Sequence, residues 1–431
     1  MASVRAQQLI KQLLRVIPVL RSQGRHSNVP AAGARSHEGP GPEAHGQAAA
    51  TARLLWRERG YAVKLFEEHG PERARSEAML LAAGIPLPVQ HRTEWALVHP
   101  KRRLWFVGVK AAGGEYQAGF AVDVSRSRAL PGHLLLYVER FGAALSDGAR
   151  AAGLRALAHL GRSRPRVLRL YVQVYAQEPG IRDQVGTVLR ELGFRSAAQP
   201  RSYRDTVLVD LAPDEDGILA SFHRSTRRNI RQIAEQPFEV RTITRPAPVG
   251  RLQALLRESL ARTGGAAQHE DWHAVTELSD RCPELSRLVG LFRTDVRGPE
   301  ALVAFAWGLN HGDCVDNPAS GMTRSPGSRT PFMYALVWDL IRWGKRAGAR
   351  WFDFGGVTRG RLGEGDPLGG ISNFKRGFND TIVAVGDEWT LEPNPLRGQL
   401  AAALSSASSH VNRTFRAAVH AADRLPWWRH A

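Results

Sequence analysis

The most informative part of this sequence is the stretch Trp351-Phe352-Asp353-Phe354-Gly355-Gly356, together with Gly370-Ile371-Ser372-Asn373-Phe374-Lys375-Arg376-Gly377-Phe378 that follows it. Its first part has the pattern of a buried strand that ends in a glycine turn. Its second part carries a cation, Lys375, between two aromatic residues. In α/β proteins, a strand that ends in such a turn is a common place for a pocket.

A helix over residues 331–347 is expected to lead into this strand. Thr330 is placed to be its N-cap, Pro331 suits the first helical position, and Gly348 lies where a C-cap glycine belongs. The residues that recur at helical spacing on its apolar face are Phe332, Leu336, Leu340, Ile341 and Gly344.

The size and composition of the chain allow two or three domains with ordinary cores, because 43% of its 431 residues are hydrophobic. Its net charge of +18 comes almost wholly from arginine. Such a charge favours nucleic acid, an anionic membrane face or a phosphorylated substrate, although general arginine usage on a solvated surface explains it equally well. Cys282 and Cys314 form neither a disulfide scaffold nor a metal-ligand spacing, which favours a reducing, cytoplasmic compartment.

The N-terminal segment, residues 1–50, is expected to lie outside the globular part. Its first 22 residues are basic and amphipathic, which suits peripheral contact with the anionic inner face of the plasma membrane or, alternatively, a docking or frayed helix. Residues 23–50 are rich in Gly, Ala, Pro and His and are interpreted as a linker. No apolar run is long enough for a transmembrane span.

Two stretches, residues 51–212 and 213–395, repeat one order of elements and predict two related α/β lobes with a cleft between them. The Ala/Ser-rich tail, 396–431, is expected to be helical. Helices are expected at 71–84, 147–162, 181–192, 214–235, 247–262, 270–281 and 331–347. Strands are expected at 95–99, 104–110, 115–124, 133–138, 166–175, 204–211, 287–295, 300–310, 313–320, 350–354 and 381–390.

The expected helix over 214–235 carries arginines on one face. Arg224, Arg228 and Arg231 are separated by three or four residues, so their charges lie close together and repel one another. A bound phosphate or pyrophosphate would offset this repulsion through bidentate guanidinium contacts. The alternative is a solvated basic face, or pairing with the acidic residues at 214–216.

Asp353 and Lys375 are the candidate catalytic residues. The carboxylate of Asp353 in an apolar strand needs partners, such as the N–H groups of the glycine turn or an arginine, and a role in stiffening that turn is favoured over general-base catalysis. Phe374 and Phe378 can anchor one helical turn and fix the direction of Lys375, which can then bind an anion or stabilise a developing oxyanion. The alternative for Lys375 is a surface lysine beside Arg376.

Four motifs in this order resemble those of the FemABX family: Ser225-x-x-Arg228, Ser320-Gly321-Met322-Thr323-Arg324, Trp351-Phe352-Asp353-Phe354-Gly355-Gly356, and Ile371-x-x-Phe374-Lys375-x-x-Phe378. Members of that family are peptidoglycan interpeptide-bridge aminoacyltransferases. The resemblance covers residues 205–395 by motif and the first lobe by topology only. It implies two tandem N-acetyltransferase (GNAT)-like lobes, each a mixed, largely antiparallel sheet flanked by helices.

The activity that this resemblance implies is amide-bond formation in peptidoglycan and cell-wall biogenesis, with an effect on cell shape. An amine of a lipid-linked or nucleotide-linked muramyl peptide would attack the ester carbonyl of an aminoacyl-tRNA. Lys375 would then lie near the reacting centre, Arg228 would contact a phosphate or a peptide carboxylate, and Asp353 would shape the site. The remaining candidate substrate-binding residues are Arg224, Arg231, Arg324, Gly355, Gly356, Phe374 and Phe378.

The donor is left open by two features. The chain lacks the long coiled-coil insertion that some family members use for tRNA. The loop over residues 323–330, which would hold the pyrophosphate of coenzyme A in an N-acetyltransferase fold, keeps Arg324 and Gly327 of the usual pattern but has Arg329 in place of its last small residue.

The co-substrate that the resemblance implies is aminoacyl-tRNA, with no permanently bound cofactor and no metal. The first alternative is an acyl-CoA-dependent N-acyltransferase that acts on an envelope or exopolysaccharide precursor. The second is a non-catalytic protein that binds RNA or an anionic membrane through its arginines.

Overall fold

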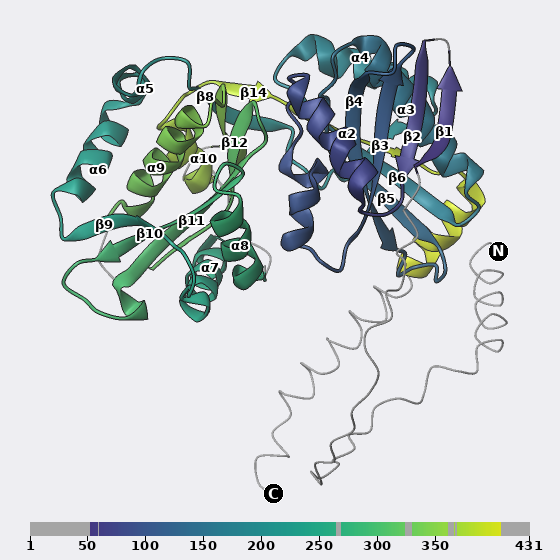
Figure 1. Ribbon diagram of the computed structural model, residues 1–431. Helices are drawn as coiled ribbons and strands as arrows, with labels where there is room; N and C mark the ends of the chain where they lie inside the picture. The colour runs from purple at the N-terminus through teal and green to yellow at the C-terminus, as the bar shows by residue number, and fades with distance from the viewer. Residues whose placement is uncertain are drawn as a thin grey trace, which may run out of the picture. The chain divides into compact units, whose positions relative to one another are not determined.

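The computed structural model describes residues 52–58, 60–263, 269–323, 330–360, 366 and 369–406. The predictions made for residues 1–50, for Arg324 and for the tail beyond residue 406 lie outside this part. The described residues belong to one compact unit and build two mixed sheets, each flanked by helices (Figure 1).

The first sheet has eight strands, in the order β1 (Arg53–Glu58), β2 (Tyr61–Phe66), β3 (Arg103–Ala111), β4 (Tyr116–Arg126), β5 (Leu134–Phe141), β6 (Val167–Tyr175), β15 (Gly386–Leu391) and β7 (Arg195–Ser196). Its strands pair antiparallel except for β5 and β6, which are parallel. The helices of this lobe are α2 (Pro71–Ala82), α3 (Asp147–Ser163) and α4 (Pro179–Glu191). Two short 3-10 helices are also present, Val89–His91 and Thr93–Leu97.

The second sheet has seven strands, in the order β14 (Ile382–Ala384), β8 (Asp205–Asp210), β13 (Trp351–Gly356), β12 (Cys314–Met322), β11 (Leu302–Asn310), β10 (Ser286–Arg293) and β9 (Phe238–Thr242). Here too one pair is parallel, β12 with β13. Its helices are α5 (Glu215–Ser221), α6 (Arg224–Ala234), α7 (Val249–Thr263), α8 (Trp272–Arg281), α9 (Phe332–Arg346) and α10 (Gly369–Arg376), with a 3-10 turn at Pro299–Ala301.

The two lobes share one topology, as the repeated order of elements predicts. In each lobe a long helix connects the parallel pair: α3 joins β5 to β6, and α9 joins β12 to β13. An antiparallel strand from the other half of the chain then lies beside the second parallel strand, β15 beside β6 and β8 beside β13. The boundary expected after residue 212 therefore does not separate the two sheets: β8 precedes it but belongs to the second sheet, and β15 follows it but belongs to the first.

The helix α9 and the strand β13 carry the core of the second lobe. Leu336, Leu340 and Ile341 of α9 are fully buried, as their spacing predicts. Phe352 and Phe354 pack on this core from β13. Because successive side chains of a strand point to opposite faces, Asp353 is directed to the other side of the sheet.

The predicted strand over 95–99 is wrong, because residues 95–97 belong to the 3-10 helix Thr93–Leu97 and residues 98–99 are in no strand. The carboxylate of Glu77 accepts hydrogen bonds from the backbone N–H of Thr93 at 2.8 Å and from its hydroxyl at 2.7 Å, which holds the start of the helical turn. The strands β1, β2 and β9 were not predicted, since each is short and most of their residues are partly exposed.

The predicted single helix over 214–235 is two helices, α5 and α6. Phe222 and His223 between them have extended backbone conformations. Phe222 is buried in edge-to-face contact with Trp338 and Phe378. The N–H of His223 donates to the carbonyl of Gly377 at 3.1 Å, so that α6 begins next to the end of α10.

The predicted single strand over 381–390 is also wrong, since β14 belongs to the second sheet and β15 to the first. Val385 between them is fully buried, and both its N–H and its carbonyl form backbone hydrogen bonds. Its N–H donates to Arg204 at 2.8 Å and its carbonyl accepts from Ala176 at 2.9 Å. A local pattern cannot show that two consecutive strands join different sheets.

The ends of α9 are partly as expected. Pro331, and not Thr330, is the residue at its N-cap position, and no side chain caps its first turn. Gly348 follows its C-terminus with a φ of 81°, a left-handed conformation that suits the predicted C-cap glycine.

Candidate active site

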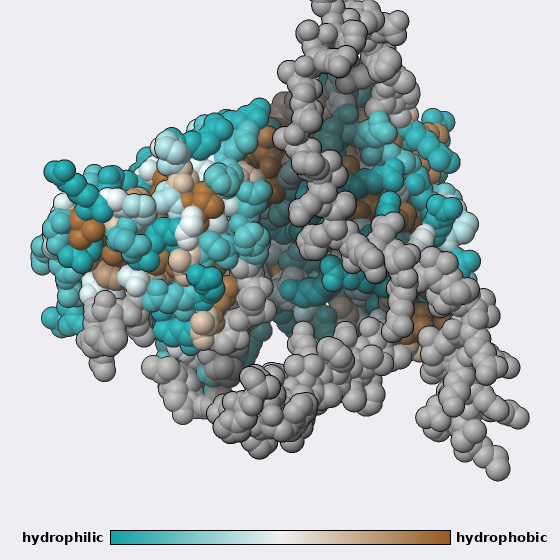
Figure 2. All heavy atoms as spheres, turned by 90° about the horizontal axis from the view of Figure 1, so that it is seen from below, coloured by the Kyte–Doolittle hydropathy of each residue, from teal (hydrophilic) through white to brown (hydrophobic). Residues whose placement is uncertain are grey.

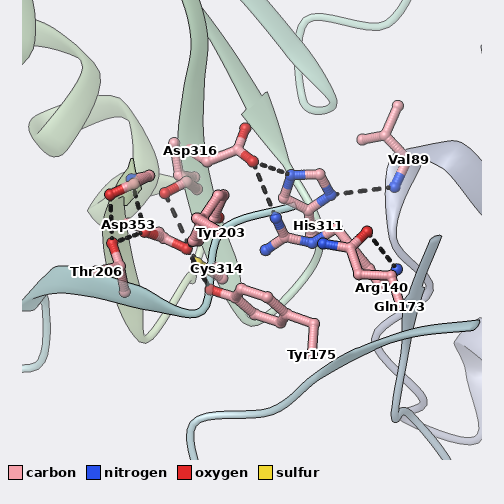
Figure 3. Close-up of polar contacts among 12 residues, drawn as sticks. Val89, Arg140, Gln173, Tyr175, Tyr203, Thr206, His311, Cys314, Asp316 and Asp353 are labelled. Carbon is pink, nitrogen blue, oxygen red and sulfur yellow. Dashed lines mark hydrogen bonds and ion pairs between the residues drawn. The ribbon is translucent and has the colours of Figure 1, made fainter. Parts of the chain in front are cut away.

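The carboxylate of Asp353 is fully buried and accepts four hydrogen bonds (Figure 3). Its Oδ2 accepts from the hydroxyls of Tyr175 at 2.5 Å and of Tyr203 at 2.7 Å. Its Oδ1 accepts from the Thr206 hydroxyl and, at 2.7 Å, from the backbone N–H of Gly355. The bond to Gly355 is the contact with the glycine turn that the sequence suggested, and the three hydroxyls supply the remaining partners that a buried carboxylate needs.

The residues that bind Asp353 come from both sheets. Tyr175 is the last residue of β6 in the first sheet, Tyr203 precedes β8, and Thr206 lies in β8 of the second sheet. Burial, together with the nearby Asp353 carboxylate, raises the pKa of both tyrosines well above the ordinary value. Both hydroxyls therefore stay protonated at neutral pH and act as donors.

Asp316 pairs with Asp353 across the parallel strands β12 and β13. It has a second, separate set of polar contacts. Its Oδ2 lies 2.9 Å from Nη1 of Arg140 and 3.1 Å from Nε2 of His311. Burial disfavours a charge on Asp316, but His311 and Arg140 together hold its pKa below the ordinary value. The Arg140 guanidinium also lies over the ring of Tyr175, 3.8 Å from its centroid (Figure 3). The first lobe thus contacts both aspartates of the second.

Arg140 has an unusual backbone conformation for a residue other than glycine, with a φ of 45°. It lies where the pairing of β5 with β6 shifts register, between Val138 and Phe141. Its side chain is buried, and its Nε and Nη2 meet no acceptor among the residues that the structure describes. Strained backbone that directs a buried cation into a polar cluster is common at functional sites, and the free N–H groups can donate to an oxygen of water or substrate.

Lys375 lies on α10 at the glycine turn of β13. Its Nζ donates to the carbonyl of Gly356 at 2.6 Å. Burial lowers the pKa of Lys375 to about 8, and the negative charge of Asp353 offsets part of this effect. Phe378 is buried and Phe374 packs against it at a centroid distance of 5.4 Å, so the two aromatic residues anchor α10 as expected.

The strands β12 and β13 pair only from Cys314 with Trp351 to Asp316 with Asp353. Beyond this point β12 continues to Met322, and its pairing with β11 shifts register at Asn317 and Pro318. Two parallel strands that separate in this way present backbone groups that can bind an extended substrate. Asp353 and the turn that Lys375 contacts lie at the point of separation.

The arginines of α6 line a hollow on the exposed side of that helix. Its lining residues are Arg224, Arg227, Arg228, Arg231, Gln232 and Glu235. Among the described residues no carboxylate forms an ion pair with the three predicted arginines: Glu215 pairs with Arg346, and Asp214 caps α5. The alternative of pairing with residues 214–216 is therefore wrong.

The structure brings some of the predicted site residues together and leaves others apart. Asp353, Gly355, Gly356 and Lys375 meet at one turn. Among the described residues no hydrogen bond or ion pair joins the α6 arginines to Lys375. Near the start of α6, the Thr226 hydroxyl donates to the carbonyl of Gly377, just after α10, at 2.8 Å. Among the described residues no group of three or more His, Cys, Asp or Glu is placed to hold a metal ion.

Sequence reasoning missed Tyr175, Tyr203, Thr206, Arg140 and Asp316. Asp316 gave a weaker signal than Asp353, because its strand also contains Asn317, Pro318 and Ser320. The other four residues gave no local signal, because their contacts with the two aspartates join segments more than 100 residues apart in the chain.

Comparisons with known proteins agree with this topology. The family model of the acetyltransferase (GNAT) domain matches residues 220–376, which lie in the second lobe. The crystal structure of FemX is similar over 78% of this chain and 99% of that chain, with a TM-score of 0.62 and 14% sequence identity. The structure of L-PGS from Bacillus licheniformis is similar over 80% of this chain and 98% of that chain, with a TM-score of 0.46 and 13% identity. No curated protein matches the sequence.

The fold of the chain is therefore that of FemX, with two tandem GNAT-like lobes, and the predicted resemblance to the FemABX family is confirmed at the level of the fold. Within the second lobe, residues 220–376 are similar in sequence to the acetyltransferase (GNAT) domain. Among the described helices, none has the length and apolar character needed to cross a membrane.

Proposed function

We propose that this protein is an acyltransferase that moves an aminoacyl group from aminoacyl-tRNA to an amine of a cell-envelope precursor, such as a muramyl peptide. The observation that carries the proposal is the position of Lys375, whose ammonium group lies at the glycine turn where the parallel strands of a GNAT-type lobe separate. An acyl group bound between the strands would have its carbonyl near this cation.

The reaction needs the amine and the ester in contact and a donor for the oxyanion that forms. The ammonium of Lys375 is the candidate donor. Asp353 is fully buried behind four hydrogen bonds, which suits a group that fixes the turn better than one that exchanges a proton with substrate. When the tetrahedral intermediate collapses, the C–O bond of the ester breaks, the proton of the attacking amine passes to the departing ribose oxygen of the tRNA, and the amide remains on the acceptor.

The donor can be tested with the purified full-length protein. It would be incubated with a muramyl-peptide acceptor and either radiolabelled aminoacyl-tRNA or radiolabelled acetyl-CoA. We expect label in the acceptor only from aminoacyl-tRNA. The match to the acetyltransferase domain model favours acyl-CoA as the second candidate donor, and transfer from acyl-CoA alone would replace the tRNA proposal. Transfer from neither, with RNA or membrane binding retained, would favour a non-catalytic role.

The α6 arginines are proposed to bind a phosphate group of the substrate. We expect the triple variant Arg224→Gln, Arg228→Gln, Arg231→Gln to bind inorganic pyrophosphate more than about tenfold more weakly, since each charge-assisted contact contributes about 1.5–3 kcal/mol. The measurement is isothermal titration calorimetry at fixed ionic strength.

A matched control for this variant removes the same charge from the surface of the first lobe, by Arg75→Gln, Arg128→Gln, Arg166→Gln, three exposed arginines outside the hollow. We expect it to retain pyrophosphate binding. Equal losses in the two variants would show that only the overall positive charge matters, and would remove the proposed phosphate site.

A further inference from the structure

The helix over residues 395–406 exposes a row of leucines. Leu396, Leu400 and Leu404 are spaced by four residues and are 76%, 45% and 41% exposed. On the face of the molecule shown in Figure 2, hydrophilic residues predominate and apolar residues form small separate groups. Three leucines in register on one helix are therefore more than the scattered apolar exposure of an ordinary surface.

An adjacent side of this helix, about 100° around its axis from the leucine row, is attached to the first lobe. Asn394 caps its start by accepting from the N–H groups of Leu396 and Arg397 at 3.1 and 3.2 Å. The Arg397 guanidinium donates to the carbonyl of Pro165, and Ala401 is buried. Because residues 397 and 401 share the attached side, the leucine row is held outward in a fixed direction.

The sequence indicates what this row contacts. From residue 396 to the end the chain has one acidic residue, Asp423, and five arginines, Arg397, Arg413, Arg416, Arg424 and Arg429. It also has two adjacent tryptophans, Trp427 and Trp428, a residue type enriched where membranes meet water. A second copy of the same basic segment would be repelled, whereas an anionic lipid surface would be attracted.

We propose that the leucine row of Leu396, Leu400 and Leu404 inserts into the surface of an anionic membrane and holds the protein there. This inference rests on the proposed function only in that a lipid-linked acceptor would lie on such a surface. The helix over residues 395–406 would lie in the plane of the interface, with its leucines among the acyl chains.

The test is co-sedimentation of the full-length protein with vesicles, either of pure phosphatidylcholine or of equal parts phosphatidylcholine and phosphatidylglycerol. We expect binding to the anionic vesicles and little to the neutral ones. The triple variant Leu396→Ser, Leu400→Ser, Leu404→Ser should bind at least about tenfold more weakly, because burial of a single leucine accounts for a factor of this order.

The matched control is Leu54→Ser, Leu81→Ser, Leu145→Ser, which changes three leucines of similar exposure elsewhere on the first lobe. It should bind vesicles as the wild type does. Equal losses in both variants, or no binding by the wild type, would overturn the proposal. Loss of a dimer in light scattering by the first variant, without vesicle binding, would assign the row to a second copy. Because no turnover is measured, failure here leaves the transferase proposal standing.

Discussion

Lys375→Met is expected to abolish most of the transfer activity while the fold is retained. The methionine keeps the length and apolar stem of the lysine but removes the ammonium that donates to the Gly356 carbonyl at 2.6 Å. If this ammonium stabilises the oxyanion, its loss should lower kcat by about 10² to 10⁴, the range found for comparable groups. The measurement is steady-state transfer from the donor that the labelling experiment identifies.

The chain offers a matched control for this variant in Lys345→Met. Lys345 also donates to backbone carbonyls, at 2.6 Å to Pro213 and 3.1 Å to Leu211, but it lies on α9 away from the glycine turn. Its replacement should leave kcat unchanged. If Lys375→Met retains full kcat, the proposed role of the lysine is wrong, whatever the donor proves to be.

The pH dependence of the transfer activity of the wild-type protein should reveal the ionisation of Lys375. Burial lowers the pKa of Lys375 to about 8, with a partly opposing effect of Asp353, and the charged form exists below that value. We therefore expect the rate of transfer to fall as the pH rises through about 8. A rate that stays constant to well above pH 8 would contradict a role for the charged lysine.

The effect of Lys375 on stability has the opposite sign. In the unfolded chain a lysine has a pKa near 10.5, so between about pH 8 and that value the unfolded state binds more protons than the folded state. The free energy of unfolding should therefore rise with pH across this window, and Lys375→Met should lack that rise. Urea unfolding of both proteins at several pH values would measure it.

Local patterns in the sequence were sufficient for most of the fold. The helix α9 and the strand β13 were predicted because their apolar residues repeat at 3.6 and at 2 residues, and the repeated order of elements revealed the duplication. The exchange of β8 and β15 between the sheets was not predictable in the same way. Val385 alone separates β14 from β15, and nothing in the local pattern marks it as the passage from one sheet to the other.

Only the part of the candidate site that lies in the second lobe was predictable from the sequence. Asp353, the glycine turn and Lys375 lie within one stretch of sequence, so their proximity follows from local geometry. Tyr175 and Arg140 reach the site from the first lobe, and only the folded chain shows that contact. The resemblance to a family placed Arg228 and Lys375 in one site, but the structure provides no contact between them, and their joint role stays a proposal.

Asp353→Ala is expected to be the most destabilising single change in this site. It removes the acceptor of three hydroxyls and one backbone N–H in a position that water does not reach, since Asp353 has no exposed surface. A buried donor without an acceptor costs about 1–3 kcal/mol, and because the four losses do not add fully we expect a decrease of at least about 3 kcal/mol in the free energy of unfolding. Denaturant unfolding monitored by circular dichroism would measure this decrease.

The control for Asp353→Ala is Asp210→Ala, in the neighbouring strand β8. Asp210 pairs with Arg350 at 3.2 Å on the surface, where an ion pair contributes only about 0–1 kcal/mol. Asp353→Asn should fall between the two, because its amide still offers one acceptor to Gly355 and Thr206 but presents a donor to Tyr175 and Tyr203. If Asp353→Ala is as stable as Asp210→Ala, the four hydrogen bonds do not hold the lobes together at this point. If it is destabilised while Asp353→Asn keeps full transfer activity, Asp353 is a scaffold residue and not a catalyst.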